Sequence, residues 1–181
     1  MKRKLSTHEL VFVALLAAIL CVSSYINIPL PFSSIPITAQ LLVVFLIALL
    51  LRPRCATLTV LVWLLLGVVG LPVFSGGKGG FGVLAGPTGG FAIGYLLCAF
   101  FVAMVCQQKK KEYQKLLVII GIGLPVTYFL GVAWMMLVTG VSWQTAVVTG
   151  VLPFVPGDIV KAVSAVFIAR PLYAVTKQRE P

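Results

Sequence analysis

Acidic residues are almost absent from this chain. Its 181 residues include 4 Asp and Glu against 14 Lys and Arg, and charged residues of both signs make up only 10% of it. Soluble domains usually carry about 25% charged residues. Together with a hydrophobic content of 60% and a mean hydropathy of +1.11, this scarcity excludes an ordinary soluble domain and predicts an integral membrane protein.

Metal-binding residues are also scarce. The single histidine, His8, has no second histidine or acidic cluster beside it, which argues against a metal site. The four cysteines show no CxxC spacing, and most of them fall within or at the ends of apolar segments, where a thiol packs as a small hydrophobic group. We therefore expect no metal and no cofactor.

No complete nucleotide-binding motif is present. Gly77-Lys78 is followed by Gly79 where a P-loop needs Ser or Thr, and Pro72 occupies the place of the first P-loop glycine. The run 80–85 imitates a dinucleotide fingerprint, but no parallel strand precedes it. We expect no ATPase activity in this chain.

Long apolar runs fill most of the sequence. A membrane-spanning helix needs about 20 residues, so little chain remains for a soluble domain. Ser6 and Glu9 have the spacing of a capping box before the first run, and Pro29 and Pro31 follow it. We predict an all-α integral membrane protein, one domain over residues 1–181, built as a compact bundle of six transmembrane helices at about 10–28, 36–51, 55–72, 88–106, 116–138 and 151–169.

The basic residues predict the orientation. Lys and Arg concentrate in short cytoplasmic loops, and the connections near 27–36, 73–87 and 139–150 contain only Lys78. We therefore expect both termini in the cytoplasm and a multi-pass protein of a bacterial-type plasma membrane. This scattered charge argues against nucleic-acid binding and suits contact with membrane lipid. The predicted cytoplasmic side carries Lys2, Arg3, Lys4, Arg52, Arg54, Lys109, Lys110, Lys111, Lys115, Arg170, Lys177 and Arg179.

Asp158 is the only acidic residue inside an expected span, and Lys161 follows one helical turn later on the same face. A charged group at the centre of a membrane helix costs about 2.5 to 3.5 kcal/mol on insertion scales, so such groups are usually paired, hydrated or functional. Pro156 and Gly157 predict a helix start or break just before Asp158. The pair is our main candidate site. An internal salt bridge that locks the last helix to its neighbours is the structural alternative.

A glycine-rich segment, 76–90, lies between the third and fourth expected spans. It is too long for a tight connection, and we expect it to fold over a pocket as a lid. A flexible linker between the two spans is the alternative.

Four motifs resemble the BioY family, whose members are the biotin-binding S components of energy-coupling factor (ECF) transporters. They occur in the family's order and cover most of the chain. They are Pro36-Ile37-Thr38-Ala39-Gln40, Leu71-Pro72-Val73-Phe74-Ser75-Gly76-Gly77, Gly86-Pro87-Thr88-Gly89-Gly90-Phe91 and Pro153-Phe154-Val155-Pro156-Gly157-Asp158-Ile159-Val160-Lys161.

The resemblance implies a substrate-capture subunit, not an enzyme, that binds biotin from the outer side. It also implies a partner module for ATP-driven uptake, made of a transmembrane coupling protein and two cytoplasmic ATPase subunits. Ala14 and Ala18 match the small-residue pattern through which S components contact the coupling protein, because small residues four apart allow close helix approach. Ordinary packing inside the bundle is the alternative for these alanines.

Biotin would suit the candidate site. Asp158 would accept a hydrogen bond from a ureido N–H, and Lys161 would donate to the ureido carbonyl. Lys78 is the candidate for the ligand carboxylate, and Gln40 and Asn27 are further polar candidates near outer helix ends. The apolar walls would include Trp63, Phe91, Tyr95 and Phe154.

Other functions stay open at this point. The fold would also suit an S component for another vitamin, since these subunits differ mainly in their pockets. A self-sufficient secondary transporter could use Asp158 as a proton carrier, although the two halves show no convincing repeat. An intramembrane enzyme could use Asp158 and Lys161 as acid and base, but no nucleophile adjoins them in the sequence.

Overall fold

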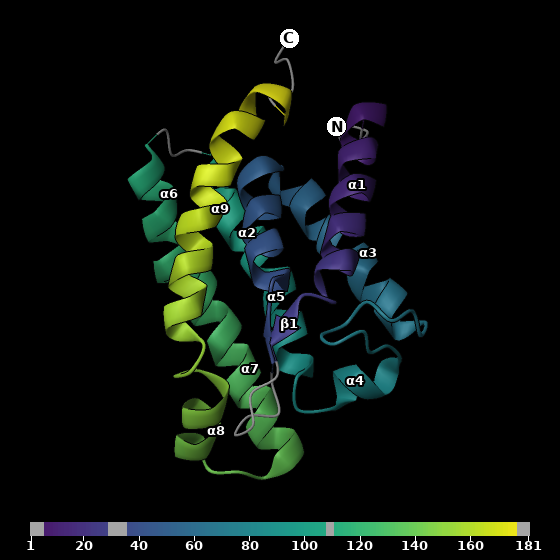
Figure 1. Cartoon of the computed structure of the whole chain (residues 1–181), viewed down its shortest axis with the longest axis vertical. Helices are drawn as coiled ribbons and strands as arrows, with labels where there is room; N and C mark the ends of the chain where they lie inside the picture. The colour runs from purple at the N-terminus through teal and green to yellow at the C-terminus, as the bar shows by residue number, and fades with distance from the viewer. Residues whose placement is uncertain (1–5, 29–35, 108–110, 177–181) are drawn as a thin grey trace.

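The computed structural model describes residues 6–28, 36–107 and 111–176, which are mostly helical (Figure 1). A π-helix, η1 (Ile119–Gly123), joins α6 to α7, and a short antiparallel pair of strands, β1 (Asn27–Ile28) and β2 (Ile37–Thr38), follows α1. The helices are α1 (Thr7–Ser23), α2 (Gln40–Leu50), α3 (Pro53–Val68), α4 (Phe81–Ala85), α5 (Gly89–Cys106), α6 (Glu112–Val118), α7 (Leu124–Thr139), α8 (Trp143–Gly150) and α9 (Val155–Thr176).

The helix starts follow local sequence signals. Ser6 and Glu9 form the predicted capping box, in which each side chain accepts a hydrogen bond from the backbone N–H of the other. α9 begins three residues before Asp158, with Pro156 in its first turn, where its missing N–H costs nothing. The predicted helix start near Asp158 is therefore confirmed.

Each expected span contains one long helix, but the boundaries differ. α1 ends at Ser23, before the predicted end near 28, because the chain turns into β1. α2 covers only 40–50 of the expected 36–51, since 37–38 pair as β2. α6, η1 and α7 form one apolar helix of 28 residues, and α9 extends to Thr176. Pro29 and Pro31 lie outside the described residues.

Not every helix is long enough to span a membrane by itself. Among the described residues, 89–106 and 112–139 are long and apolar enough, and α8 with α9 adds a third span if a bend of 50° is accepted. α1, α2 and α3 have 17, 11 and 16 residues, and the 11 residues of α2 rise only about 16 Å. A membrane-embedded helical protein is supported, while the count of six spans stays a prediction.

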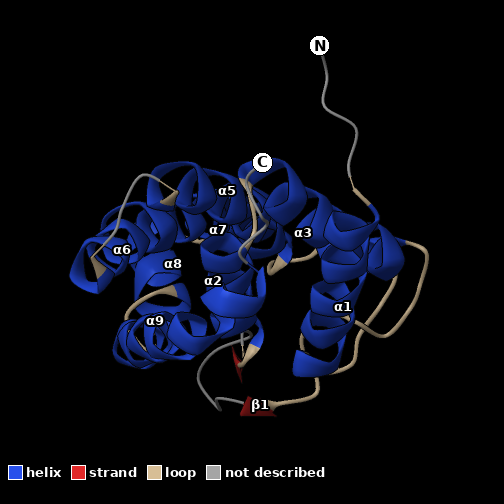
Figure 2. Cartoon of the chain, turned by 90° about the horizontal axis from the view of Figure 1, so that it is seen from above, coloured by secondary structure: helices blue, strands red, loops and turns tan. Residues whose placement is uncertain are grey.

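α2 is the central helix of the bundle. Seen from above, it lies among the others, with α1 and α3 on one side and α9 on another (Figure 2). It packs on α9, α5, α3 and α1, and 8 of its 11 side chains are buried, which explains why it is apolar all round. α5 has its most extensive packing against α7.

Different helix ends gather at the two ends of the bundle. The first turns of α1 and α6 and the last turn of α9 lie at one end, and α4, α8 and β1 lie toward the other (Figure 1). An even number of crossings would produce this arrangement. Of the basic residues assigned to the cytoplasmic side, Lys2, Arg3, Lys4, Lys109, Lys110, Lys177 and Arg179 lie outside the described part of the chain.

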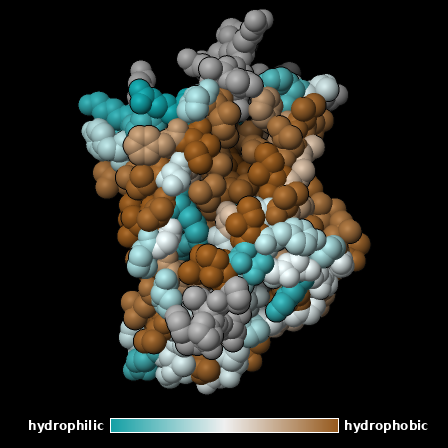
Figure 3. Space-filling view, in the orientation of Figure 1, coloured by the Kyte–Doolittle hydropathy of each residue, from teal (hydrophilic) through white to brown (hydrophobic). Residues whose placement is uncertain are grey.

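Apolar side chains cover the middle of the molecule. On the face shown in Figure 3 they form a broad area, and hydrophilic side chains gather above and below it. On α1 alone, Val11, Leu15 and Val22 are more than half exposed. Such a surface is stable in lipid and would aggregate in water, which agrees with the composition.

Candidate functional site

Two adjoining cavities open between the helices toward the end that carries α4 and α8. The first, which we call the loop cavity, measures about 580 Å³ including its mouth, and the second, the Asp158 cavity, about 370 Å³. The two cavities are neighbours, because they share the lining residues Pro36, Thr38, Phe91 and Tyr95.

The Asp158 cavity contains the predicted charge pair. The Lys161 ammonium donates to Oδ1 of Asp158 at 2.7 Å, and the hydroxyl of Tyr128 donates to Oδ2 at 2.6 Å. Asp158 is 3% exposed, and the Lys161 side chain is 15% exposed. Because Asp158 is in the first turn of α9, the helix dipole also favours its negative charge.

The pair does not by itself connect α9 to another helix, since Asp158 and Lys161 lie on the same helix. Tyr128, on α7, makes that connection through its hydrogen bond to Asp158. Sequence reasoning missed Tyr128. It is 30 residues from Asp158, and no spacing relates a tyrosine on one apolar helix to a carboxylate on another.

One side of the loop cavity is covered by the segment between α3 and α4. The position of this segment depends on two buried side chains. Nε2 of Gln40 and Nε1 of Trp63 both donate to the backbone oxygen of Val73, at 3.1 and 2.8 Å. Gln40 is 2% exposed. It also lines the loop cavity, and its amide nitrogen anchors the loop, while its contact with a ligand stays a prediction.

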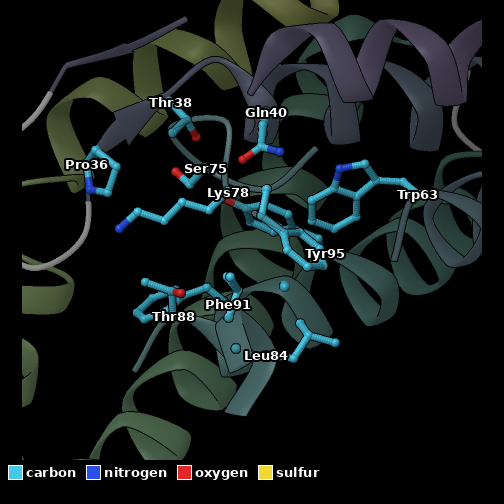
Figure 4. Close-up of a pocket in the computed structure, with 14 residues that line it drawn as sticks. Pro36, Thr38, Gln40, Trp63, Ser75, Lys78, Leu84, Thr88, Phe91 and Tyr95 are labelled. Carbon is cyan, nitrogen blue, oxygen red and sulfur yellow. The ribbon is translucent and has the colours of Figure 1, made fainter. Parts of the chain in front are cut away.

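Lys78 ends a tight turn in this loop. The N–H of Phe74 donates to the Lys78 oxygen at 2.8 Å, and Gly76 and Gly77 between them adopt φ of 74° and 70°, which suits glycine. The Gly76 N–H also donates to the Ser24 oxygen at the end of α1, at 3.1 Å. Figure 4 shows the Lys78 side chain extended across the cavity, with its nitrogen on the side of Pro36.

The whole segment between α3 and α5, which we call the loop, has a defined structure and is not a flexible linker. It contains α4, and residues from Phe74 to Thr88 line the cavity, as expected of a segment folded over a pocket. The indole of Trp134 on α7 donates to the Gly86 oxygen at 3.1 Å, near the far end of the loop. Two tryptophans therefore hold the backbone at both sides of the segment that carries Lys78 and α4.

Aromatic side chains form much of the apolar wall. Trp63, Phe91 and Tyr95 line the loop cavity, and Phe154 lines the Asp158 cavity, so all four candidates face a cavity, and their contact with a ligand stays a prediction. Trp63 meets the edge of Phe74 at a centroid distance of 5.2 Å. Phe91 and Tyr95 line both cavities.

Three candidates lie away from the cavities. Asn27 lines neither of them, and its side-chain amide donates to the Tyr25 oxygen at 3.2 Å, so its ligand role stays a prediction. Ala14 and Ala18 are exposed on α1. Their exposure argues against ordinary packing inside the bundle. Within residues 6–28, 36–107 and 111–176, no three His, Cys, Asp or Glu side chains gather as a metal site would require.

Comparison with known proteins identifies the family. A model of the BioY family matches residues 1–178. The chain belongs to the BioY family. Similar BioY proteins include the biotin transporter BioY of Rhizobium etli, 38% identical over 92% of this chain and 93% of that protein, and the probable biotin transporter BioY of Pyrococcus horikoshii, 37% identical over 95% and 100%.

A solved BioY-like structure has the same fold. The S-component for biotin from an ECF-type ABC transporter superposes with a TM-score of 0.86 over 93% of this chain and 94% of that one, at 27% identity. The predicted resemblance to BioY is thus confirmed, and with it the expectation of a transporter component and not an enzyme. The all-α membrane architecture is supported by the same match.

Proposed function

We propose that this chain is the substrate-binding S component of an ECF-type transporter, and that it binds biotin across the two neighbouring cavities. The observation that carries the proposal is the ion pair of buried Asp158 with Lys161, whose side chains both line a cavity between the helices. The names of the BioY relatives and of the solved S-component support biotin as the ligand.

The urea of biotin complements this pair. A cyclic urea presents an N–H beside a carbonyl, and Asp158 and Lys161 present an acceptor beside a donor, 2.7 Å apart. Hydrogen bonds to charged groups in a poorly hydrated site are stronger than neutral ones. The ring system would contact Phe91, Tyr95 and Phe154.

The acidic tail of biotin would extend into the loop cavity. Lys78 is the cation in its lining, and Thr38, Ser75 and Thr88 supply hydroxyl groups there. We assign Lys78 to the ligand carboxylate. Gln40 would contribute through its amide oxygen and by holding the loop, because its amide nitrogen donates to Val73.

Transport requires a partner in this proposal. The chain has no complete P-loop, so ATP hydrolysis belongs to two cytoplasmic ATPase subunits, coupled through a transmembrane protein that contacts Ala14 and Ala18 on α1. Capture takes place from the outer side of the plasma membrane, with six spans and both termini in the cytoplasm. The cavities open at the end opposite the first turn of α1 and the last turn of α9, which suits capture from the outer side.

Equilibrium binding of biotin to the purified chain in detergent tests the proposal. Asp158→Asn should weaken binding about tenfold to hundredfold, as the loss of a hydrogen bond to a charged group predicts. Glu112→Gln is the matched control, because Glu112 and Lys115 form the other i, i+3 ion pair, at 3.3 Å, outside both cavities. Size exclusion checks the fold of each variant.

Three outcomes are informative. Tight binding by the wild type and Glu112→Gln, lost in Asp158→Asn, supports the proposal. Equal binding by all three proteins contradicts the site. A well-folded wild type that does not bind biotin contradicts the assignment of biotin as the ligand. A screen of other vitamins then tests the alternative S-component assignment.

A further inference from the structure

The Asp158 carboxylate is held from two directions by different helices. Lys161, one turn along α9, donates to Oδ1 at 2.7 Å, and Tyr128 on α7 donates to Oδ2 at 2.6 Å. Each carboxylate oxygen therefore has one protein donor and keeps lone-pair capacity for a second. Since Asp158 is 3% exposed, water has little access to donate a second hydrogen bond to either oxygen.

The two helices that supply these groups are positioned independently. α7 packs mainly against α5, and α9 packs mainly against α2. The Asp158 cavity lies between them, lined by Thr127 and Tyr128 from α7, by Asp158 and Lys161 from α9, and by Phe154 in the turn just before α9. The bond between Tyr128 and Asp158 thus spans the region where a ligand would enter between α7 and α9.

We propose that Tyr128 is a positioning residue, which keeps the Asp158 carboxylate turned toward the ligand and away from a two-oxygen pairing with Lys161. Lys161 is close enough on the same helix to attract both oxygens. A second donor on the opposite helix opposes that rotation. This inference rests on the proposed function, because it concerns how the same site recognises its ligand.

The position of Tyr128 also favours one kind of ligand group. When the phenol donates its only hydrogen to Asp158, its oxygen can only accept further hydrogen bonds. The wall near Asp158 then presents acceptors, and Lys161 presents the donor. A ligand with N–H groups beside a carbonyl fits this arrangement, and a ligand with a second carbonyl in place of an N–H does not.

The test is biotin binding by Tyr128→Phe, which keeps the ring and removes the hydroxyl. Tyr173→Phe is the matched control, because the Tyr173 hydroxyl is buried and has no hydrogen-bond partner in the described part of the chain. We expect Tyr128→Phe to weaken binding of biotin about tenfold to hundredfold. Desthiobiotin, which keeps the urea, should lose affinity by the same factor, and Tyr173→Phe should stay within about twofold of wild type.

A second arm separates positioning from a general structural effect. Tyr128→Phe is also made in the Asp158→Asn background and measured at high biotin concentration. If Tyr128 acts through the carboxylate, the added substitution changes the affinity little there, since coupled residues are not additive. If Tyr128→Phe lowers the affinity for biotin by the same factor in the Asp158→Asn variant as in the wild type, the inference is overturned. That result would show that Tyr128 acts independently of Asp158.

The remaining outcomes distinguish the two proposals. If the wild type binds biotin and Tyr128→Phe binds it within twofold, the positioning role is overturned and the proposed function stands. If the folded wild type binds no biotin, both are overturned. Melting temperatures of the two Phe variants, recorded beside the affinities, show whether the α7–α9 connection also contributes to stability.

Discussion

At the scale of single residues, the buried charges show why an apolar chain retains them. Asp158 accepts from Lys161 and Tyr128, so its burial leaves no oxygen without a donor. An ion pair at i, i+3 on an exposed helix contributes only a few tenths of a kcal/mol, and a buried pair is often no better than apolar residues of the same size. Ligand binding is therefore a stronger reason for the pair than stability.

The stability and binding roles of the pair can be separated. Lys161→Met should destabilise the protein by about 3 to 5 kcal/mol, because it leaves a buried carboxylate without its cation. Adding Asp158→Asn to Lys161→Met should recover most of that loss, since no unpaired charge remains. Apparent melting temperatures in detergent measure both effects. Recovery of biotin binding by the double variant would contradict the assignment of the pair to the ligand.

The role of Lys78 depends on the ligand carboxylate. Lys78 is exposed at the cavity mouth, so its charge is partly screened and Lys78→Ala should weaken biotin binding less than Asp158→Asn. Biotinamide, which lacks the carboxylate, should bind the variant and the wild type alike. A variant that binds both ligands as well as the wild type does would remove Lys78 from the site.

At the scale of elements, glycines decide how closely α5 and α7 approach. Gly90 on α5 lies against Trp134, and Gly131 on α7 lies against the ring of Phe91, so that a Cβ at either position would overlap its neighbour. Helices in membranes commonly associate through such small residues, because lipid supplies no hydrophobic driving force between them. This packing positions Phe91, which lines both cavities.

Gly131→Ala should therefore affect both stability and binding. The new methyl group would displace the Phe91 ring, at a cost of about 1 to 3 kcal/mol for overpacking, and would reshape the wall shared by the two cavities. Gly121→Ala is the matched control in the same continuous helix, because a Cβ there meets open space. Melting temperatures and biotin affinities of the two variants should differ. Equal effects would contradict this account of the α5–α7 contact.

The loop over the cavity depends on redundant donors to one carbonyl. Gln40→Leu and Trp63→Phe each leave the Val73 oxygen with one of its two side-chain donors. The double variant removes both donors. We expect the double variant to lose about 1 to 2 kcal/mol more stability than the sum of the single variants. Faster amide hydrogen exchange over 71–80 should accompany that loss.

A second pair of substitutions serves as the control for the non-additive effect. Trp134 donates to Gly86, a different carbonyl of the same loop, so Gln40→Leu and Trp134→Phe should have additive effects. Additive effects in both pairs would show that the two donors do not share the anchoring of Val73.

At the scale of the whole molecule, the bundle is a binding unit without a visible means of energy coupling. The first turn of α1 and the last turn of α9 lie at one end, and the cavities open toward the other. The apolar exterior suits a helical body in lipid, and the exposed alanines of α1 offer a surface for another helix. These features suit a subunit that captures a ligand and transfers it with a partner.

Uptake should therefore require the partner module. Proteoliposomes containing this chain alone should bind biotin but should not accumulate it under a pH gradient, because the chain has neither a nucleotide-binding motif nor a convincing internal repeat. Accumulation measured with radiolabelled biotin should appear only with the coupling module and ATP. Uptake driven by the gradient alone would favour the proton-coupled secondary transporter.

Much of this protein followed from properties that are local in the chain. Apolar content predicted a membrane protein, runs of about 20 residues predicted the long helices, and helical periodicity put Asp158 and Lys161 on one face. Residues within one turn are positioned by the helix itself, whatever surrounds it. The capping box at Ser6 and the start of α9 were predictable for the same reason.

Contacts between distant segments were decided only by the tertiary structure. The hydrogen bond from Tyr128 to Asp158, the two donors to Val73 and the contact of Gly131 with Phe91 join elements that no sequence spacing relates. The early end of α1 and the short α2 likewise reflect the pairing of β1 with β2, which replaces helical hydrogen bonds. Local hydrogen bonds and polarity determined where the helices form, whereas the packing of side chains between them determined which residues line the two cavities.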